Sequence, residues 1–385
     1  MEDAEIGMSL SILILGLSVT SSWGNGHATT YRGLMRELVK RGHRVTFLER
    51  DMPWYADNRD LPKPPYGRTM LYASVDELRR RWSATVTAAD VIILGSFVPD
   101  GAEIARWLIG RSRGLTAFYD IDTPVTIARL EKGEADYISL DLVPQFDLYL
   151  SFTGGPTLSR LERDFGARMA RPLYCSADTE IYKPLSHPLK WDLGYIGTYS
   201  ADRQPALQEL LIGPLRALAH AKGVVAGPQY PDDVTWPKNV RRIQHLAPDR
   251  HRAFYAAQRF TLNVTRRDMV RAGHSPSIRL FEAAATGTPI ISDWWQGLDE
   301  FFTPGEEILV AKSGKDVVRA LCDLGEDRRR TLAERARARV LSEHTAAHRA
   351  LALERYIREA AQHRRERRLQ TRLAGAAAPR PPVVP

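Results

Sequence analysis

The sequence predicts an α/β protein built from two doubly wound domains that face a central cleft. Apolar runs with the length of strands alternate with helical patterns, an order typical of parallel sheets covered by helices. The alternation stops in residues 175–190, which contain Pro184 and Pro188, and then starts again. A chain of 385 residues has room for two or three domains at roughly 100 to 200 residues each.

The first half of the chain predicts one doubly wound domain over residues 1–180. Residues 11–17 are the first predicted strand, residues 27–40 a helix that ends at Arg41 and Gly42, and residues 43–49 the second strand. Further strands are predicted at residues 91–94, 115–119 and 148–152, and further helices at residues 101–111, 124–132 and 156–165.

The second half repeats the pattern over residues 181–345. Its predicted strands are residues 193–196, 223–226, 260–264 and 289–292, and its predicted helices are residues 205–221, 253–258 and 276–286. Residues 317–361 are largely helical and charged. We expect a C-terminal helix and basic segment at residues 346–372 and a disordered tail rich in alanine and proline at residues 373–385.

The composition, with 44% hydrophobic and 26% charged residues, is that of an ordinary globular protein. The longest apolar run, residues 8–19, is shorter than the roughly 20 residues that a membrane-spanning helix needs. The acidic residues 1–5 differ from the basic start of a secretory signal, so we expect a cytoplasmic protein. The two cysteines, Cys175 and Cys322, have neither metal-ligand nor disulfide spacing.

The net charge of +8 is concentrated near the C-terminus. Six arginines and one glutamate between residues 364 and 380 supply five of the eight positive charges, so the body of the chain is nearly balanced. Such a tail can contact a polyanion, for example a nucleic-acid backbone or anionic lipid, or it can be a solvated end. The arginines are Arg364, Arg365, Arg367, Arg368, Arg372 and Arg380.

One helix is delimited by its own sequence. Ser275 is a natural N-cap, Pro276 suits the first helical position, and Gly287 suits the C-terminal stop. The N-terminus of such a helix favours a phosphate group. Arg279 and Glu282 lie three residues apart on one face, where they could contact a diphosphate and a hydroxyl group, or could form only a surface ion pair.

The run from Arg279 through Glu282 and Pro289 to residues 305–306 resembles the C-terminal domain of CgeB-like (spore maturation protein type) glycosyltransferases. These are relatives of glycosyltransferase family 4 within the GT-B fold, which has two Rossmann-like domains. The resemblance implies that Glu282 is the second glutamate of a Glu-x7-Glu motif and accepts hydrogen bonds from the donor ribose. The position of the first glutamate, near the donor sugar, holds His274. Ser275 and Ser277 are assigned to the same donor site.

Two further segments fit this resemblance. Residues 192–200, followed by Arg203, resemble the first strand and glycine loop of the nucleotide-binding domain, so Gly197, Thr198 and Arg203 are expected at the diphosphate. Residues 21–30, with Gly26 and His27, are similar to the loop after the first strand of many GT-B enzymes. Their spacing is not the dinucleotide-binding pattern Gly-x-Gly-x-x-Gly, so an NAD enzyme is a poor fit.

The acceptor side is predicted from residues at strand ends, where open sheets bind ligands. His27 could accept a proton near neutral pH or cap a helix. Asp122 is the second candidate catalytic residue, although Asp120 and Asp122 could also bind a metal, or Asp122 could cap the helix from Pro124. The remaining acceptor-side candidates are Gly26, Asp120, Thr153 and Gly154, the last of which could also form only a tight turn.

The resemblance implies a glycosyltransferase that moves a hexose-like sugar from a nucleoside diphosphate sugar, expected to be UDP-linked, to an unknown hydroxyl. It implies retention of the anomeric configuration, no metal and no cofactor besides the donor. An inverting reaction would follow if His27 acts as a base. The alternatives are transfer to hydroxymethylated bases in DNA, a GT-B nucleotide-sugar epimerase, and a non-catalytic nucleotide-binding module.

Overall fold

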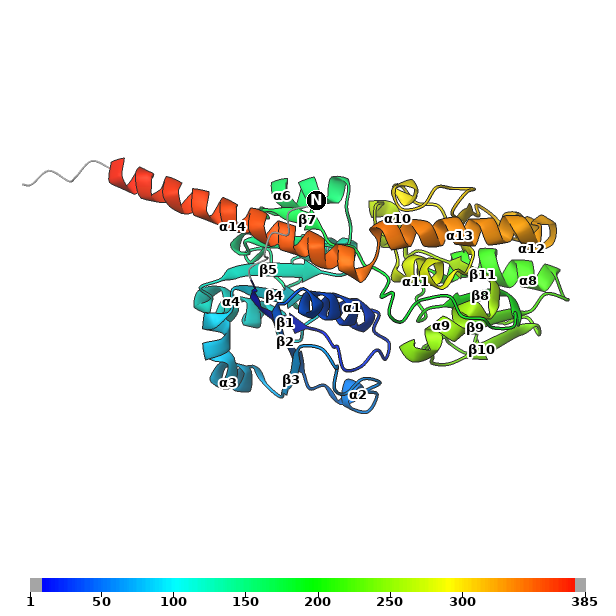
Figure 1. Cartoon of the computed structure of the whole chain (residues 1–385), viewed down its shortest axis with the longest axis horizontal. Coiled ribbons are helices and arrows are strands. Elements are labelled where there is room, and N and C mark those ends of the chain that lie inside the picture. Colours follow the sequence, from blue (N-terminus) through cyan, green and yellow to red (C-terminus); the bar gives the residue numbers. More distant parts are fainter. Residues whose placement is uncertain (1–8, 378–385) are drawn as a thin grey trace, which may run out of the picture.

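The computed structural model describes residues 9–377 and contains two domains, each with one parallel sheet between layers of helices (Figure 1). The N-terminal sheet has seven strands in the order β3-β2-β1-β4-β5-β6-β7, and the C-terminal sheet has six in the order β10-β9-β8-β11-β12-β13. Every pairing between neighbouring strands is parallel. The predicted fold class of two doubly wound domains is confirmed.

The N-terminal domain alternates strands and helices along the chain. Its strands are β1 (Ser11–Gly16), β2 (Arg44–Arg50), β3 (Arg68–Tyr72), β4 (Val91–Gly95), β5 (Leu115–Asp120), β6 (Leu148–Ser151) and β7 (Ala170–Pro172). Its helices are α1 (His27–Lys40), α2 (Pro53–Ala56), α3 (Val75–Ala88), α4 (Gly101–Arg111), α5 (Thr123–Glu131), η1 (Val143–Gln145) and α6 (Pro156–Arg163).

The C-terminal domain begins at β8, which eighteen residues separate from β7, and the predicted boundary at residue 180 lies between the two strands. Its strands are β8 (Trp191–Ile196), β9 (Gly223–Ala226), β10 (Val240–Ile243), β11 (Gln258–Asn263), β12 (Ile290–Ser292) and β13 (Leu309–Val310). The helices that follow are α7 (Gln204–Leu207), η2 (Gln208–Ile212), α8 (Gly213–Ala217), α9 (Pro248–Ala256), α10 (Arg267–Ala272), α11 (Ile278–Thr286), η3 (Leu298–Glu300), α12 (Gly314–Asp323), α13 (Glu326–Glu343) and α14 (Ala346–Ala377).

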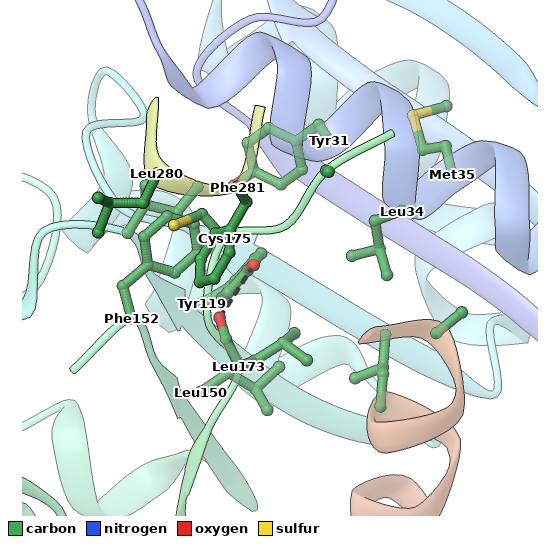
Figure 2. Close-up of a cluster of buried hydrophobic side chains, with 14 of the residues drawn as sticks. Tyr31, Leu34, Met35, Tyr119, Leu150, Phe152, Leu173, Cys175, Leu280 and Phe281 are labelled. Atoms are coloured by element: carbon green, nitrogen blue, oxygen red, sulfur yellow. Dashed lines mark hydrogen bonds between the residues drawn. The ribbon is translucent and has the colours of Figure 1, made fainter. Parts of the chain in front are cut away.

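The last helix, α14, connects the two domains. It leaves α13 at the C-terminal domain and runs across the N-terminal domain, orange to red in Figure 1. Glu354 of α14 accepts a hydrogen bond from Arg41 Nη2 at 2.7 Å, and Tyr356 Oη donates to the carbonyl of Pro172 at 3.1 Å. The buried core is continuous across this junction: Leu280 and Phe281 of α11 lie beside Cys175 and Tyr119 (Figure 2).

Several predicted boundaries differ from the observed ones. The helix expected at residues 276–286 begins at Ile278 with Ser277 as its N-cap, so Ser275 and Pro276 precede it. The helix expected at residues 205–221 contains a π-helical segment, η2, directly before Gly213 and Pro214, and it ends at Ala217. Pro214 has no N–H to continue the regular hydrogen-bond pattern. At the C-terminus, α14 continues to Ala377, into the predicted tail, and residues 378–385 lie outside the described range.

No helix within residues 9–377 is long and apolar enough to cross a membrane.

Candidate functional site

A cavity of about 570 Å³ lies between the two domains at the carboxyl ends of both sheets. The N-terminal domain contributes the loops after β1, β4, β5 and β6, and the C-terminal domain those after β8, β9, β10 and β11. In each sheet the strand order reverses here, at β1/β4 and at β8/β11, the place where such sheets bind ligands. Ten predicted site residues line this cavity: Gly26, His27, Asp122, Gly197, Thr198, Arg203, Ser275, Ser277, Arg279 and Glu282.

Arg279 is buried in the first turn of α11 and is held in place by oxygen atoms of neighbouring strands. Its Nε donates to the carbonyl of Ile196 at 2.6 Å, and its Nη1 donates to Asn263 Oδ1 at 2.7 Å. The guanidinium also lies over the ring of Tyr195, 4.9 Å from its centroid. No ion pair joins Arg279 to Glu282, so the alternative of a surface ion pair is wrong. The cation is fixed at the positive end of a helix, where an anion is favoured.

The loop after β8 approaches Arg279 closely at Gly197. A Cβ added to Gly197 would lie 3.0 Å from Arg279 Nη2 and 2.6 Å from Tyr195 Oη, so only glycine fits without displacing them. Arg203 lies on the same side of the cavity, at the start of α7. Its Nη2 donates to the carbonyl of Thr198 at 2.6 Å, and its buried Nε has no hydrogen-bond partner within residues 9–377.

Glu282 lies one turn further along α11 and is 3% exposed. Its Oε2 accepts a hydrogen bond from Tyr255 Oη at 3.2 Å and lies 3.7 Å from His251 Nδ1. The same His251 nitrogen is 3.2 Å from Tyr182 Oη. Burial, and then the nearby Glu282 carboxylate, raise the pKa of both tyrosines well above its usual value. The hydroxyls of Tyr182 and Tyr255 are therefore neutral at physiological pH. The carboxylate of Glu282 still has oxygen lone pairs that can accept hydrogen bonds from other donors.

Across the cavity, His27 and Asp122 face each other from the N-terminal domain. His27 Nε2 lies 3.9 Å from Asp122 Oδ2, longer than a hydrogen bond, and His27 Nδ1 is buried without a partner in the described structure. Asp122 is the N-cap residue of α5, but its side chain makes no capping hydrogen bond. Asp122 therefore occupies the expected cap position without capping the helix through its carboxylate, which lines the cavity.

Four predicted site residues do not line the cavity. Asp120 is fully buried behind it, where its carboxylate accepts hydrogen bonds from Tyr149 Oη at 2.6 Å and Thr126 Oγ1 at 2.7 Å. This burial raises the pKa of Asp120 to about 6. Thr153 and Gly154 instead join the domains: Thr153 Oγ1 donates to Ser275 Oγ at 2.9 Å, and the Gly154 N–H donates to the carbonyl of residue 274 at 2.9 Å.

His274, the fourth of these residues, is part of the contact between domains. Its backbone has a positive φ of 46°, and its ring lies so close to Gly155 and Gly297 that a Cβ on either would be 2.4 Å from a ring atom. Its Nδ1 is 3.0 Å from Glu300 Oε1, outside hydrogen-bond geometry. Residue 274 precedes α11 and its side chain does not line the cavity, so its expected position near the donor sugar stays a prediction.

Several cavity residues were not predicted from the sequence. Arg266, after β11, lies 3.7 Å from Asp122 and 4.0 Å from Asp202, so it connects the two sides of the cavity. His251 and Tyr255 lie on α9, and Asn263 ends β11. These residues belong to segments other than α11, and only the folded domains bring them to Arg279, Glu282 or Asp122. A strand-end position was the one available signal, for Asn263 and Arg266.

The described residues contain no group of three or more His, Cys, Asp or Glu side chains that could hold a metal ion.

Comparisons with known proteins agree with this architecture. Residues 203–355 match the sequence model of a glycosyl transferase-like family. Sucrose-phosphate synthase from Thermosynechococcus elongatus is similar in structure, with a TM-score of 0.66 and 15% identity over 91% of this chain and 98% of that one. HepE from Anabaena, in complex with UDP and glucose, has a TM-score of 0.66 and 12% identity over 91% and 100% of the two chains.

A third similar structure is an alpha-glucosyltransferase in complex with UDP and a 13-mer DNA containing an HMU base. Its TM-score is 0.67, with 12% identity over 91% of this chain and 100% of that one. No curated protein shows significant sequence similarity to the chain. The chain therefore has the GT-B fold of glycosyltransferases. Its second half carries the glycosyl transferase-like sequence pattern.

Proposed function

We propose that this protein is a glycosyltransferase that moves a hexose-like sugar from a UDP-sugar to a hydroxyl group of an acceptor. One observation carries the proposal: Arg279 and Glu282 stand one turn apart on a buried helix, and both face a cavity shared by the two domains. The first supplies a fixed cation for a diphosphate, and the second supplies a carboxylate for ribose hydroxyls. The family match over residues 203–355 supports the same reaction class, and the CgeB-like and family 4 relationship is part of the proposal.

The donor diphosphate is proposed to lie against Gly197 and Thr198, between Arg203 and Arg279. Backbone N–H groups at the start of α11 and the two guanidinium groups neutralise the charge that develops on the leaving diphosphate. We therefore propose that the reaction needs no metal. UDP is the nucleotide named in two of the similar structures, and we adopt it here as the donor nucleotide.

The transfer breaks the bond between the anomeric carbon and the diphosphate oxygen and forms a bond to the acceptor oxygen. In the retaining reaction that the family 4 resemblance favours, the acceptor proton goes to the departing phosphate on the same face of the sugar. In an inverting reaction, the acceptor proton goes to His27, whose ring faces the cavity. Asp122 and Arg266 complete the acceptor side.

The test is product analysis after incubation with a panel of nucleotide sugars, with and without candidate acceptors. We expect UDP release and a new glycoside whose anomeric configuration, read by NMR, matches that of the donor. Turnover should continue in EDTA; loss in EDTA and rescue by Mn²⁺ would contradict the metal-independent reaction. An epimerised UDP-sugar without transfer would show the epimerase alternative, and UDP binding without any turnover would show the binding module.

A further inference from the structure

A second cavity, of about 700 Å³, lies at the amino ends of the N-terminal strands, on the edge of the sheet opposite the candidate active site. It is formed between α14 and the loops that precede β5, β6 and β7. Four arginines line it, Arg168 from the loop before β7 and Arg364, Arg367 and Arg368 from α14, together with one acidic residue, Asp147. We call this the arginine pocket.

The single negative charge of Asp147 neutralises only part of the positive charge of the four arginines. Its carboxylate is 6% exposed and lies 3.4 Å from Arg168, 3.4 Å from Arg364 and 3.0 Å from Arg367. Among the described residues that line the pocket, Asp147 is the one carboxylate beside four arginines, so these side chains together carry a net charge of about three positive units at neutral pH.

The arginines also affect one another. Burial, and then the charge of Arg367, lower the pKa of Arg168. Arg364 also donates a hydrogen bond to the carbonyl of Gly114 at the edge of the pocket, and the two oxygens of Asp147 are shared among Arg168, Arg364 and Arg367. The planar pairs of donors on guanidinium groups match the oxygens of a phosphate group.

We propose that the arginine pocket binds a small phosphate-bearing anion, such as a diphosphate or a phosphorylated metabolite. The arginines converge on one concave space, which suits a compact ligand with several oxygens better than an extended backbone. The arginine pocket lies at the amino ends of the N-terminal strands, whereas Arg279 lines the cavity at their carboxyl ends. This proposal therefore does not rest on the proposed function. An anion bound here would also fasten α14 to the N-terminal domain.

Pyrophosphate is the probe, measured by calorimetry on the full chain at constant ionic strength. The measurements use an Arg279→Ala background, which disables the candidate donor site. We expect one binding event, weakened about tenfold or more by Arg168→Gln and by Arg368→Gln, since each removes hydrogen bonds to a charged group. The matched control is Arg365→Gln, an exposed arginine on the same helix that does not line the pocket, and it should leave the affinity within about twofold.

Three results would overturn the proposal. They are the absence of pyrophosphate binding in the Arg279→Ala protein, an equal loss in Arg365→Gln, and tighter binding of a DNA duplex that the same two variants abolish. The last would identify a nucleic-acid site. Thermal melts of each variant check that it is folded. Failure of the proposed function is seen separately, as UDP binding that does not change in Arg279→Ala.

Discussion

Arg279 and Glu282 show how burial changes the role of a charged side chain. On an exposed helix the pair would contribute only tenths of a kcal/mol. Here both side chains are buried, each has polar partners from another element, and neither neutralises the other. Such an arrangement is costly unless a ligand or a hydrogen-bond network compensates it, and the cavity beside them provides the place for that ligand.

We predict that Arg279→Ala and Glu282→Gln each weaken UDP binding by about 1.5 to 3 kcal/mol, or about 10- to 150-fold, the usual range for hydrogen bonds to charged groups. Isothermal titration calorimetry on the folded variants measures the effect. Arg271→Ala is the control, because that arginine lies on α10 and is exposed. Unchanged UDP affinity in both variants would show that α11 does not bind the donor.

Asp120 offers a pH-dependent test of the buried residues behind the cavity. Burial raises its pKa from 3.8 to about 6, so the folded chain binds this proton more tightly than the unfolded chain does. The resulting stability is fully present below about pH 4 and is lost as the pH rises through about 6. The difference between the pKa of Asp120 in the unfolded chain and in the folded chain corresponds to about 3 kcal/mol of stability.

We therefore expect the wild-type free energy of unfolding to fall by about 3 kcal/mol relative to Asp120→Asn between about pH 4 and 7. Urea denaturation at a series of pH values measures both proteins. Asparagine keeps an oxygen that can accept from Tyr149 or Thr126, so the variant is a matched one. Parallel pH profiles of the two proteins would show that Asp120 has an ordinary pKa.

The loop before α11 is held against the other domain by close packing. Gly155, at the start of α6, has a φ of 55° and a ψ of −142°, and the ring of His274 occupies the space that its Cβ would need. Gly133 also has a positive φ, of 74°, but nothing lies within 4 Å of its Cβ position. Alanine at either position therefore meets backbone strain, and at Gly155 its Cβ would also overlap the His274 ring.

We predict that Gly133→Ala costs about 1 kcal/mol through backbone strain. Gly155→Ala should cost a further ~1 to 3 kcal/mol, because its φ and ψ lie close to a region that essentially only glycine adopts and its Cβ would overlap the His274 ring. Urea denaturation measures both. In a His274→Ala background the extra cost of Gly155→Ala should fall, because the ring is gone. An unchanged cost in that background would place the strain in the backbone alone.

The elements show which parts of the fold local sequence can predict. Central strands such as β1 and β4 are continuous apolar runs, and they were found. The strand β3 was not predicted, since it lies at the sheet edge with a mixed exposure pattern. The helix α3 was not predicted either, although Ser74 caps it and Val75, Leu78, Trp82 and Val86 form a buried stripe at helical spacing. The start of α11 was misplaced because the hydroxyl of Ser275, which suits an N-cap, binds Thr153 of the other domain instead.

The candidate site was predictable where its residues share one helix or one loop. The spacing of Arg279 and Glu282 places both on one helix face, and the family resemblance is what assigned that face to the donor. The partners His251 and Tyr255 lie on α9 and Arg266 follows β11, so no spacing within the sequence links them to Glu282 or Asp122. The sequence shows the basic segment as a concentration of arginines near the C-terminus, but the place of Arg364, Arg367 and Arg368 at the amino ends of the strands follows only from the path of α14.

The whole molecule depends on the first part of α14 more than on its end. Ala350, Leu353 and Ile357 of this helix are buried in the core that joins the domains. Beyond residue 361, the described contacts of the helix are polar ones such as those of Arg364 and Arg367 with Asp147. The first half of α14 therefore packs into the core that joins the two domains. Its second half contacts only the surface of the N-terminal domain in the part of the chain that the structure describes.

We predict that truncation after Ala361 leaves UDP affinity within about twofold but lowers the melting temperature, because Asp147 keeps only Arg168 as a counter-charge. Truncation after Arg368 is the control and should melt like the full chain. Removal of all residues after Thr345 should prevent folding, since it exposes the apolar core of the junction. Loss of UDP binding in a folded chain truncated after Ala361 would place the basic segment in the donor site.

The junction between the domains has a mechanical consequence. The chain crosses between them twice, and the two crossings are hydrogen-bonded to each other: the Ala177 N–H donates to the carbonyl of His344 at 3.0 Å, and the Ala346 N–H donates to the carbonyl of Ala177 at 2.9 Å. Both connections therefore share one pivot. A change in the width of the cleft would therefore have to move both connections together and would also strain the contacts of Thr153 and Gly154 with the loop before α11.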